Sequence, residues 1–285
     1  MTRKVSPNNV RRTILGVRYP LPIRIKHKSA IAMNASAYLK RIGYVGWPDI
    51  CLASLQTLHY QHLLAIPLEN LAIHAGIPIR LSVDALFEKI VTQRRGGICY
   101  ELNGLFYELL LELGFTVKRV SGRTYTAGIG FNPEFDHLAL IVQINEIDYL
   151  VDIGLGRRFP LYPLRLIVDS VQEDHTGCYR ITQPAYGSFM LSQRTEAGLW
   201  ENVYQFTLTP QELSAFDAMC HYHQTSPASF FTRNKVCTLI TEEGRITLTD
   251  HSLKRTKNGQ TYEQLVTSPK VFDQLLTDYF GMNPY

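Results

Sequence analysis

One short stretch of the chain combines the residue types of a reactive thiol site. Residues 94–103 read RRGGICYELN, and apolar residues then recur at helical spacing as far as Gly114. This pattern predicts a helix that begins at or beside Cys99 and ends before Gly114, since glycine is typical just past a helix end. The dipole and unpaired N–H groups of a helix start favour an anion, and the two neighbouring arginines add positive charge. The sequence therefore predicts a site that favours the thiolate of Cys99.

A reactive cysteine also needs a base and a group that orients the base. His137 opens the apolar stretch 137–144, and Asp152 lies in the next one, 149–153. A two-residue turn at 145–146 would place both side chains on one face as diagonal neighbours, with backbones roughly 7–8 Å apart. A change of register by one residue would separate them. Because a carboxylate in an apolar strand needs a partner, we expect Asp152 to bind His137.

The three residues in chain order fit the roles of nucleophile, base and orienter in nucleophilic catalysis. The alternatives at this point are a buried, unreactive Cys99 and an isolated structural His137–Asp152 pair. A rival cysteine–histidine site is the run 220–223 (CHYH), but cysteine and histidine that are adjacent in sequence do not generally align as nucleophile and base.

A metal site is a further alternative. Cys51, His59 and His62 fall on one predicted helix, with the histidines at a spacing of three. No fourth ligand is evident, so we expect no metal and interpret these histidines as surface residues.

Composition describes an ordinary globular protein of 285 residues, with 45% hydrophobic and 19% charged residues. No apolar run is long enough to span a membrane. The five cysteines are widely spaced and odd in number, which argues against a disulfide framework and favours a reducing, cytoplasmic location.

The net charge of +4 depends on one segment. Residues 1–32 hold eight Lys and Arg and no acid, which leaves 21 basic against 25 acidic residues in the remainder. The remainder is therefore mildly acidic, and we expect no nucleic-acid partner. We interpret residues 1–32 as a disordered extension. A nucleic-acid-binding arm, a transit-like segment and a stretch upstream of a start at Met33 stay open.

The patterning changes twice along the chain. Residues 33–115 are mostly helical, and residues 116–206 contain short strands between glycines and prolines, which favours a β-barrel or curved sheet. A helix from Pro210, a hairpin over 235–249 and one or two helices over 262–280 are expected after that. These patterns predict an α+β multidomain fold.

At its candidate site residues the chain resembles the arylamine N-acetyltransferase family. Five motifs occur in the family's order, and together they are far more specific than any one alone. They cover about residues 33–285 and lie at 66–71 (IPLENL), 95–103 (RGGICYELN), 137–138 (HL), 151–156 (VDIGLG) and 224–231 (QTSPASFF).

The resemblance implies three domains after the extension: a helical bundle (33–115), a β-barrel (116–206) and an α/β lid (207–285). It implies a cysteine-protease-like triad of Cys99, His137 and Asp152. The implied reaction is ping-pong: acetyl-CoA acetylates the cysteine, and an arylamine, arylhydrazine or arylhydroxylamine then takes the acetyl group.

Further residue roles follow only from the resemblance. It implies contacts to CoA from Tyr222, Thr225 and Ser226, and an acceptor pocket lined by Leu68, Gly154 and Leu155. The family usually has phenylalanine at the two leucine positions, so acceptor preference is expected to differ more than the chemistry. It also suggests an ion pair between Arg95 and Glu69.

Other functions share the same three-residue order. A thiol hydrolase or transglutaminase-like enzyme would act on a peptide or amide, and a macrolactam-forming amide synthase would use a carrier-bound acyl chain. A binding module without catalysis would be expected to have lost one of the three residues. The sequence does not determine the physiological acceptor, the acyl-chain preference or the oligomeric state.

Overall fold

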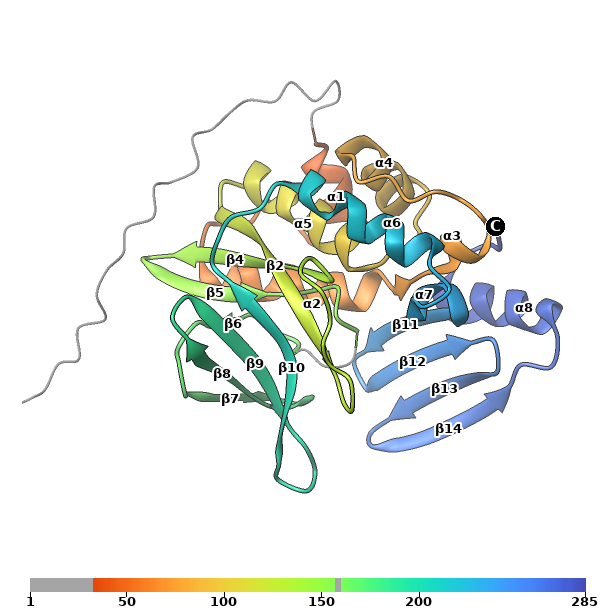
Figure 1. Cartoon of the computed structure of the whole chain (residues 1–285). Helices are drawn as coiled ribbons and strands as arrows, with labels where there is room; N and C mark the ends of the chain where they lie inside the picture. Colours follow the sequence, from red (N-terminus) through yellow and green to blue (C-terminus); the bar gives the residue numbers. More distant parts are fainter. Residues whose placement is uncertain (1–32, 157–159) are drawn as a thin grey trace, which may run out of the picture. The chain divides into compact units, whose positions relative to one another are not determined.

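The computed structural model describes residues 33–156 and 160–285 (Figure 1). The predictions about residues 1–32 lie outside the described residues. Helices and two antiparallel sheets make up the described part, so the predicted α+β class is confirmed. None of the helices within it is long and apolar enough to cross a bilayer.

Helices fill most of residues 33–112. Asn34 caps the first of them, because its side-chain oxygen accepts a hydrogen bond from the Ala37 N–H at 3.0 Å. The helix of Cys99 begins at that residue, as predicted, and Gly114 follows its end with φ +93°. The helices are α1 (Ala35–Arg41), α2 (Leu52–Ala65), α3 (Leu71–His74), α4 (Val83–Phe87), the π-helical turn η1 (Glu88–Thr92) and α5 (Cys99–Glu112).

The larger sheet forms a nearly closed barrel, as expected. Its order is β6-β5-β4-β2-β10-β9-β8-β7, and β3 pairs with β2. The two end strands are joined by a side chain: Gln172 accepts from the Arg165 N–H and donates to the Arg165 carbonyl, both at 2.8 Å. The strands are β2 (Thr116–Thr126), β3 (Gly130–Phe131), β4 (His137–Ile144), β5 (Ile147–Val151), β6 (Leu164–Arg165), β7 (Val171–Asp174), β8 (Gly177–Ala185), β9 (Ser188–Arg194) and β10 (Trp200–Thr207).

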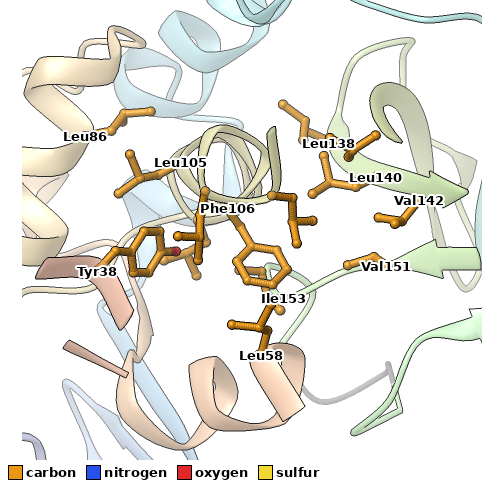
Figure 2. Packing of buried hydrophobic residues seen from close by; sticks show 14 of the residues in the cluster. Tyr38, Leu58, Leu86, Leu105, Phe106, Leu138, Leu140, Val142, Val151 and Ile153 are labelled. Carbon is orange, nitrogen blue, oxygen red and sulfur yellow. The ribbon is translucent and has the colours of Figure 1, made fainter. Parts of the chain in front are cut away.

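Strand β4 is buried on both faces, which explains its nearly continuous apolar sequence. One face belongs to a core shared with α5 and the other to the core of the barrel. Figure 2 shows Phe106 of α5 in the first core, between Leu58 of α2 and the side chains of Leu140 and Val151. The helix that carries Cys99 is therefore packed directly on the strand that carries His137.

The smaller sheet has the order β1-β11-β12-β13-β14. Its first strand, β1 (Leu68–Glu69), comes from the helical region and also forms a bridge with Gly97, just before Cys99. The expected hairpin over 235–249 is confirmed, but residues 262–265 form a strand and not a helix. The remaining elements are the 3₁₀ turn η2 (Leu213–Phe216), α6 (Asp217–Thr225), α7 (Phe230–Arg233), β11 (Val236–Thr241), β12 (Gly244–Thr249), β13 (Ser252–Lys257), β14 (Gln260–Leu265) and α8 (Pro269–Phe280).

Candidate active site

Cys99 is the first residue of α5 and is only 5% exposed. The segment before it is held in two ways. The Glu69 N–H donates to the Gly97 carbonyl at 3.0 Å, and the Ile98 N–H donates to the side chain of Glu101 at 3.0 Å. The helix start and the β1 strand therefore fix the backbone just before the thiol.

The two glycines before Cys99 are required by close packing. A Cβ at Gly96 would lie 2.0 Å from the Pro67 carbonyl oxygen, and one at Gly97 would lie 2.7 Å from a carboxylate oxygen of Glu101. Neither position tolerates a side chain without a shift of the backbone. The glycines let the β1 segment and the helix start approach each other.

His137 and Asp152 are hydrogen-bonded in the interior. The His137 Nε2 and an Asp152 carboxylate oxygen are 2.6 Å apart, and the two residues are 2% and 1% exposed. The strand register is the expected one, with Ile144 opposite Ile147 and Leu140 opposite Val151. Since Asp152 directly follows β5, this register places it beside His137.

The imidazole of His137 also contacts Cys99. Burial on its own would lower the pKa of His137, but the charge and hydrogen bond of Asp152 and the hydrogen bond with Cys99 outweigh it and hold that pKa well above its ordinary value. Because Asp152 takes Nε2, the other ring nitrogen, Nδ1, is left for the thiol. This arrangement favours the protonated imidazole of His137 beside the Cys99 side chain.

Asn103 connects the helix of Cys99 to Asp152 and to the strand of His137, and its role was not foreseen from the sequence. Its amide donates to the Asp152 carboxylate at 2.9 Å and to the Leu138 carbonyl at 2.7 Å, and its oxygen accepts from the Ile153 N–H at 3.0 Å. The available signal was its position four residues after Cys99, on the same buried face of the helix.

Two further contacts complete the surroundings of the base and the thiol. The rings of Tyr204 and His137 lie 5.0 Å apart, so a buried aromatic residue of β10 covers the imidazole. A Cβ at Gly154 would lie 2.6 Å from the Cys99 Cα and 2.9 Å from the Asn103 amide nitrogen. Glycine therefore allows the loop after β5 to press directly against the nucleophile segment.

A cluster of acidic and basic residues lies at the start of α5, and it corrects the expectation of an ion pair between Arg95 and Glu69. Lys89 binds Glu101 at 2.8 Å and lies 3.7 Å from Glu69, so lysine and not Arg95 is the cation paired with Glu69. Burial on its own would lower the pKa of Lys89, but the two carboxylates raise it. Arg95 instead donates to the Asn283 carbonyl at 2.8 Å.

The expected CoA-contacting residues lie together at the end of α6. Tyr222 is 41% exposed, the Thr225 hydroxyl donates to the His221 carbonyl at 2.8 Å, and the Ser226 N–H donates to the Tyr222 carbonyl at 2.9 Å. The two expected acceptor-pocket leucines are partly buried, Leu68 against the core of α5 and Leu155 against the core of the barrel.

The two histidines of the alternative metal site have other hydrogen-bond partners. His59 and His62 are fully buried, not at the surface as expected, and they bind the Leu161 carbonyl at 2.8 Å and the Tyr38 hydroxyl at 3.0 Å. No group of three or more potential ligands that could hold a metal occurs within residues 33–156 and 160–285.

The rival cysteine, Cys220, is also not arranged as a nucleophile. It is buried, and burial raises its pKa, whereas the adjacent His221 is exposed.

Comparison with known proteins identifies the family of this chain. A family model described as N-acetyltransferase matches residues 51–283. The chain belongs to the arylamine N-acetyltransferase family. It is 36% identical to the arylamine N-acetyltransferase of Mycolicibacterium smegmatis over 259 residues, 89% of this chain and 93% of that protein. It is 30% identical to human arylamine N-acetyltransferase 1 over 274 residues, 88% of this chain and 94% of the human protein.

A solved structure gives the same result for the fold. The arylamine N-acetyltransferase of Mycobacterium marinum in complex with CoA superposes with a TM-score of 0.80 at 31% identity, covering 88% of this chain and 93% of that one. The chain is thus an acyltransferase of this family.

Proposed function

We propose that the protein transfers acetyl groups from acetyl-CoA to arylamines, arylhydrazines or arylhydroxylamines through a thioester on Cys99. Family membership supports acetyl transfer, and the CoA bound to the M. marinum relative supports the donor. The observation that carries the proposal is the 2.6 Å hydrogen bond between His137 and Asp152, with Cys99 at the start of the helix that packs on the strand of His137.

In the first half-reaction the Cys99 thiolate attacks the acetyl carbonyl, and the bond to the CoA sulfur breaks. His137 gives its proton to the departing CoA thiolate. The backbone N–H groups of Cys99 and Tyr100, at the start of α5, stabilise the oxyanion that forms in between. The products are free CoA and an acetylated Cys99.

The second half-reaction restores the enzyme. The acceptor nitrogen attacks the Cys99 thioester, the carbon–sulfur bond breaks, and His137 accepts the proton that the nitrogen loses. Asp152 keeps the imidazole oriented and stabilises its charged form throughout. In each step the leaving group is a thiolate, which departs readily. The same base and the same oxyanion donors therefore serve both steps.

The remaining roles are carried by resemblance and by position. We assign Tyr222, Thr225 and Ser226 to CoA, and Leu68, Gly154 and Leu155 to the acceptor pocket. Gly154 has the strongest structural support, because it lies directly against the Cys99 backbone.

We also propose that residues 33–115, 116–206 and 207–285 act as bundle, barrel and lid. All five cysteines are free, which supports a reducing, cytoplasmic setting.

The experiment is intact-mass measurement after mixing with acetyl-CoA and no amine. We expect one added acetyl group, which disappears in Cys99→Ala and persists in Cys220→Ala, a matched buried cysteine. An unchanged mass, or acetylation that survives Cys99→Ala, would contradict the proposal. Acylation by an activated peptide ester or a carrier-bound acyl chain, but not by acetyl-CoA, would favour the hydrolase or the amide synthase.

A further inference from the structure

Tyr100, the residue after the nucleophile Cys99, is hydrogen-bonded to the segment that precedes the base His137. The Tyr100 hydroxyl lies 2.8 Å from the Phe135 carbonyl and 3.0 Å from the Asp136 carbonyl, and it donates to both. Tyr100 is fully buried, so packing fixes the position of its hydroxyl. Since Tyr100 follows Cys99 and Asp136 precedes His137, this link joins the two segments independently of the thiol–imidazole contact.

The side chain of Asp136 is held from several directions. Its Oδ1 lies 3.3 Å from the Nε2 of His223, and its Oδ2 accepts from the Asn132 amide at 3.2 Å and from the Thr124 hydroxyl. Burial on its own would raise the pKa of Asp136, but the neighbouring His223 and the hydrogen bond from Thr124 outweigh it and lower that pKa. The residue before His137 is therefore fixed by its backbone and by its carboxylate.

His223 brings the end of α6 into the same cluster. It is 8% exposed, and its Nδ1 lies 3.1 Å from the Ser229 hydroxyl, which also caps α7. Its ring centre is 6.0 Å from that of Tyr100 and 5.3 Å from that of Phe231. One buried histidine thus contacts the nucleophile helix, the base segment and the turn between α6 and α7.

We infer that Tyr100, Asp136 and His223 form a positioning unit that sets the distance between the Cys99 thiol and the His137 imidazole. The inference deepens the proposed function and rests on it only for the roles of Cys99 and His137. The attraction between a thiolate and an imidazolium falls as they separate, and a displacement of about 1 Å at a reacting pair can cost roughly 100-fold in rate. The side chains of the unit act through the segments they hold, without touching the reacting atoms.

The test is the alkylation of Cys99 by iodoacetamide in the full-length protein, measured by peptide mass spectrometry from acid to alkaline pH. Tyr100→Phe removes only the hydroxyl. We expect alkylation at neutral pH to slow by about tenfold or more, and its pH profile to shift to higher pH, because the imidazolium no longer supports the thiolate fully. The same variant should slow acetylation by acetyl-CoA by a similar factor.

The matched control is Tyr179→Phe. Tyr179 is also fully buried, but its hydroxyl binds Thr176 at 2.7 Å and Gln193 at 3.2 Å within the barrel. Its loss should lower the melting temperature about as much as Tyr100→Phe and leave Cys99 alkylation within about twofold of wild type. Equal alkylation rates in the two variants would overturn the inference.

A second pair of variants keeps the test decisive if Tyr100→Phe folds poorly. Asp136→Asn and His223→Gln should each slow alkylation, and the double variant should be no slower than the worse single one, because the two act as one unit. The inference would be overturned if the rate losses of the two single variants multiply in the double variant. Wild-type alkylation rates in both single variants would also overturn it. Alkylation needs no acyl donor, so a wild-type protein that rejects acetyl-CoA would refute the proposed function separately.

Discussion

Gly154→Ala is the sharpest test of how tightly the site is assembled. The added Cβ would lie 2.6 Å from the Cys99 Cα, 2.9 Å from the Asn103 Nδ2 and 3.0 Å from the Cys99 Cβ. Carbon atoms pack at about 3.5–4.0 Å, so the loop after β5 and the start of α5 must separate by roughly 1 Å. That movement pulls Asn103 away from Asp152, to which it donates at 2.9 Å.

The expected cost has two parts. Overpacking of this kind typically destabilises by about 1–3 kcal/mol, which corresponds to a fall in melting temperature of roughly 2–10 °C for a chain of this size. A shift of about 1 Å between reacting groups can cost roughly 100-fold in rate, or about 3 kcal/mol in activation free energy. Acetylation of Cys99 should therefore fall far more than stability alone explains.

The assay is the rate of Cys99 acetylation by intact mass, measured well below the melting temperature. Gly104→Ala, in the same helix, is the matched control. Its Cβ would lie 3.2 Å from a methyl of Leu213 and 3.4 Å from one of Leu86, which are ends of flexible side chains. Near-wild-type acetylation in Gly154→Ala, or an equal loss in both variants, would refute the reasoning.

Three further predictions concern the base, the acceptor and acid stability. Asp152→Asn should lower acetyl transfer by about 10⁴-fold, because asparagine mis-orients the imidazole of His137, and iodoacetamide alkylation of Cys99 should slow as well. Circular dichroism checks folding, and wild-type rates would make Asp152 purely structural. Leu155→Phe should raise the second-order rate constant for a small arylamine by up to about tenfold through ring contacts, with acetylation of Cys99 unchanged in single-turnover kinetics. A change confined to the acetylation step would place Leu155 outside the acceptor pocket. Burial lowers the pKa of His59 to about 4. As pH falls from about 6.5 to about 4, the unfolded chain binds a proton at His59 that the folded protein does not bind. This lowers the free energy of unfolding by about 3 kcal/mol over that window. Urea unfolding of His59→Asn should show a shallower loss over the same range, and an unchanged slope would contradict this assignment.

The smaller sheet shows where sequence patterns stop being informative. Residues 262–265 were expected to be helical, but they form the edge strand β14, in which every residue is exposed. A strand without a buried face has no alternation of apolar and polar residues to reveal it. The two-residue strand β1 is equally hidden, because it is defined only by its pairing with β11 and Gly97.

The partners of buried charged and polar residues were also beyond the sequence. Arg95 donates to Asn283, 188 positions further on, and Glu69 pairs with Lys89. His59 and His62 were expected at the surface, but both are fully buried. Which of several like residues meets a given partner depends on how distant segments pack, and spacing along the chain does not encode that.

The sequence by itself determined the parts of the site that depend on local geometry. The helix start at Cys99 follows from apolar periodicity and glycine, and the His137–Asp152 register follows from a two-residue turn. Asn145 and Glu146 in that turn both have positive φ, as a tight hairpin turn requires. The tertiary structure decided what joins these pieces, namely the contact of α5 with β4, the Asn103 bridge and the approach of Gly154 to Cys99. Those contacts join residues up to 55 positions apart, from Cys99 to Gly154. Only the packing of the helix against the barrel brings these residues into contact.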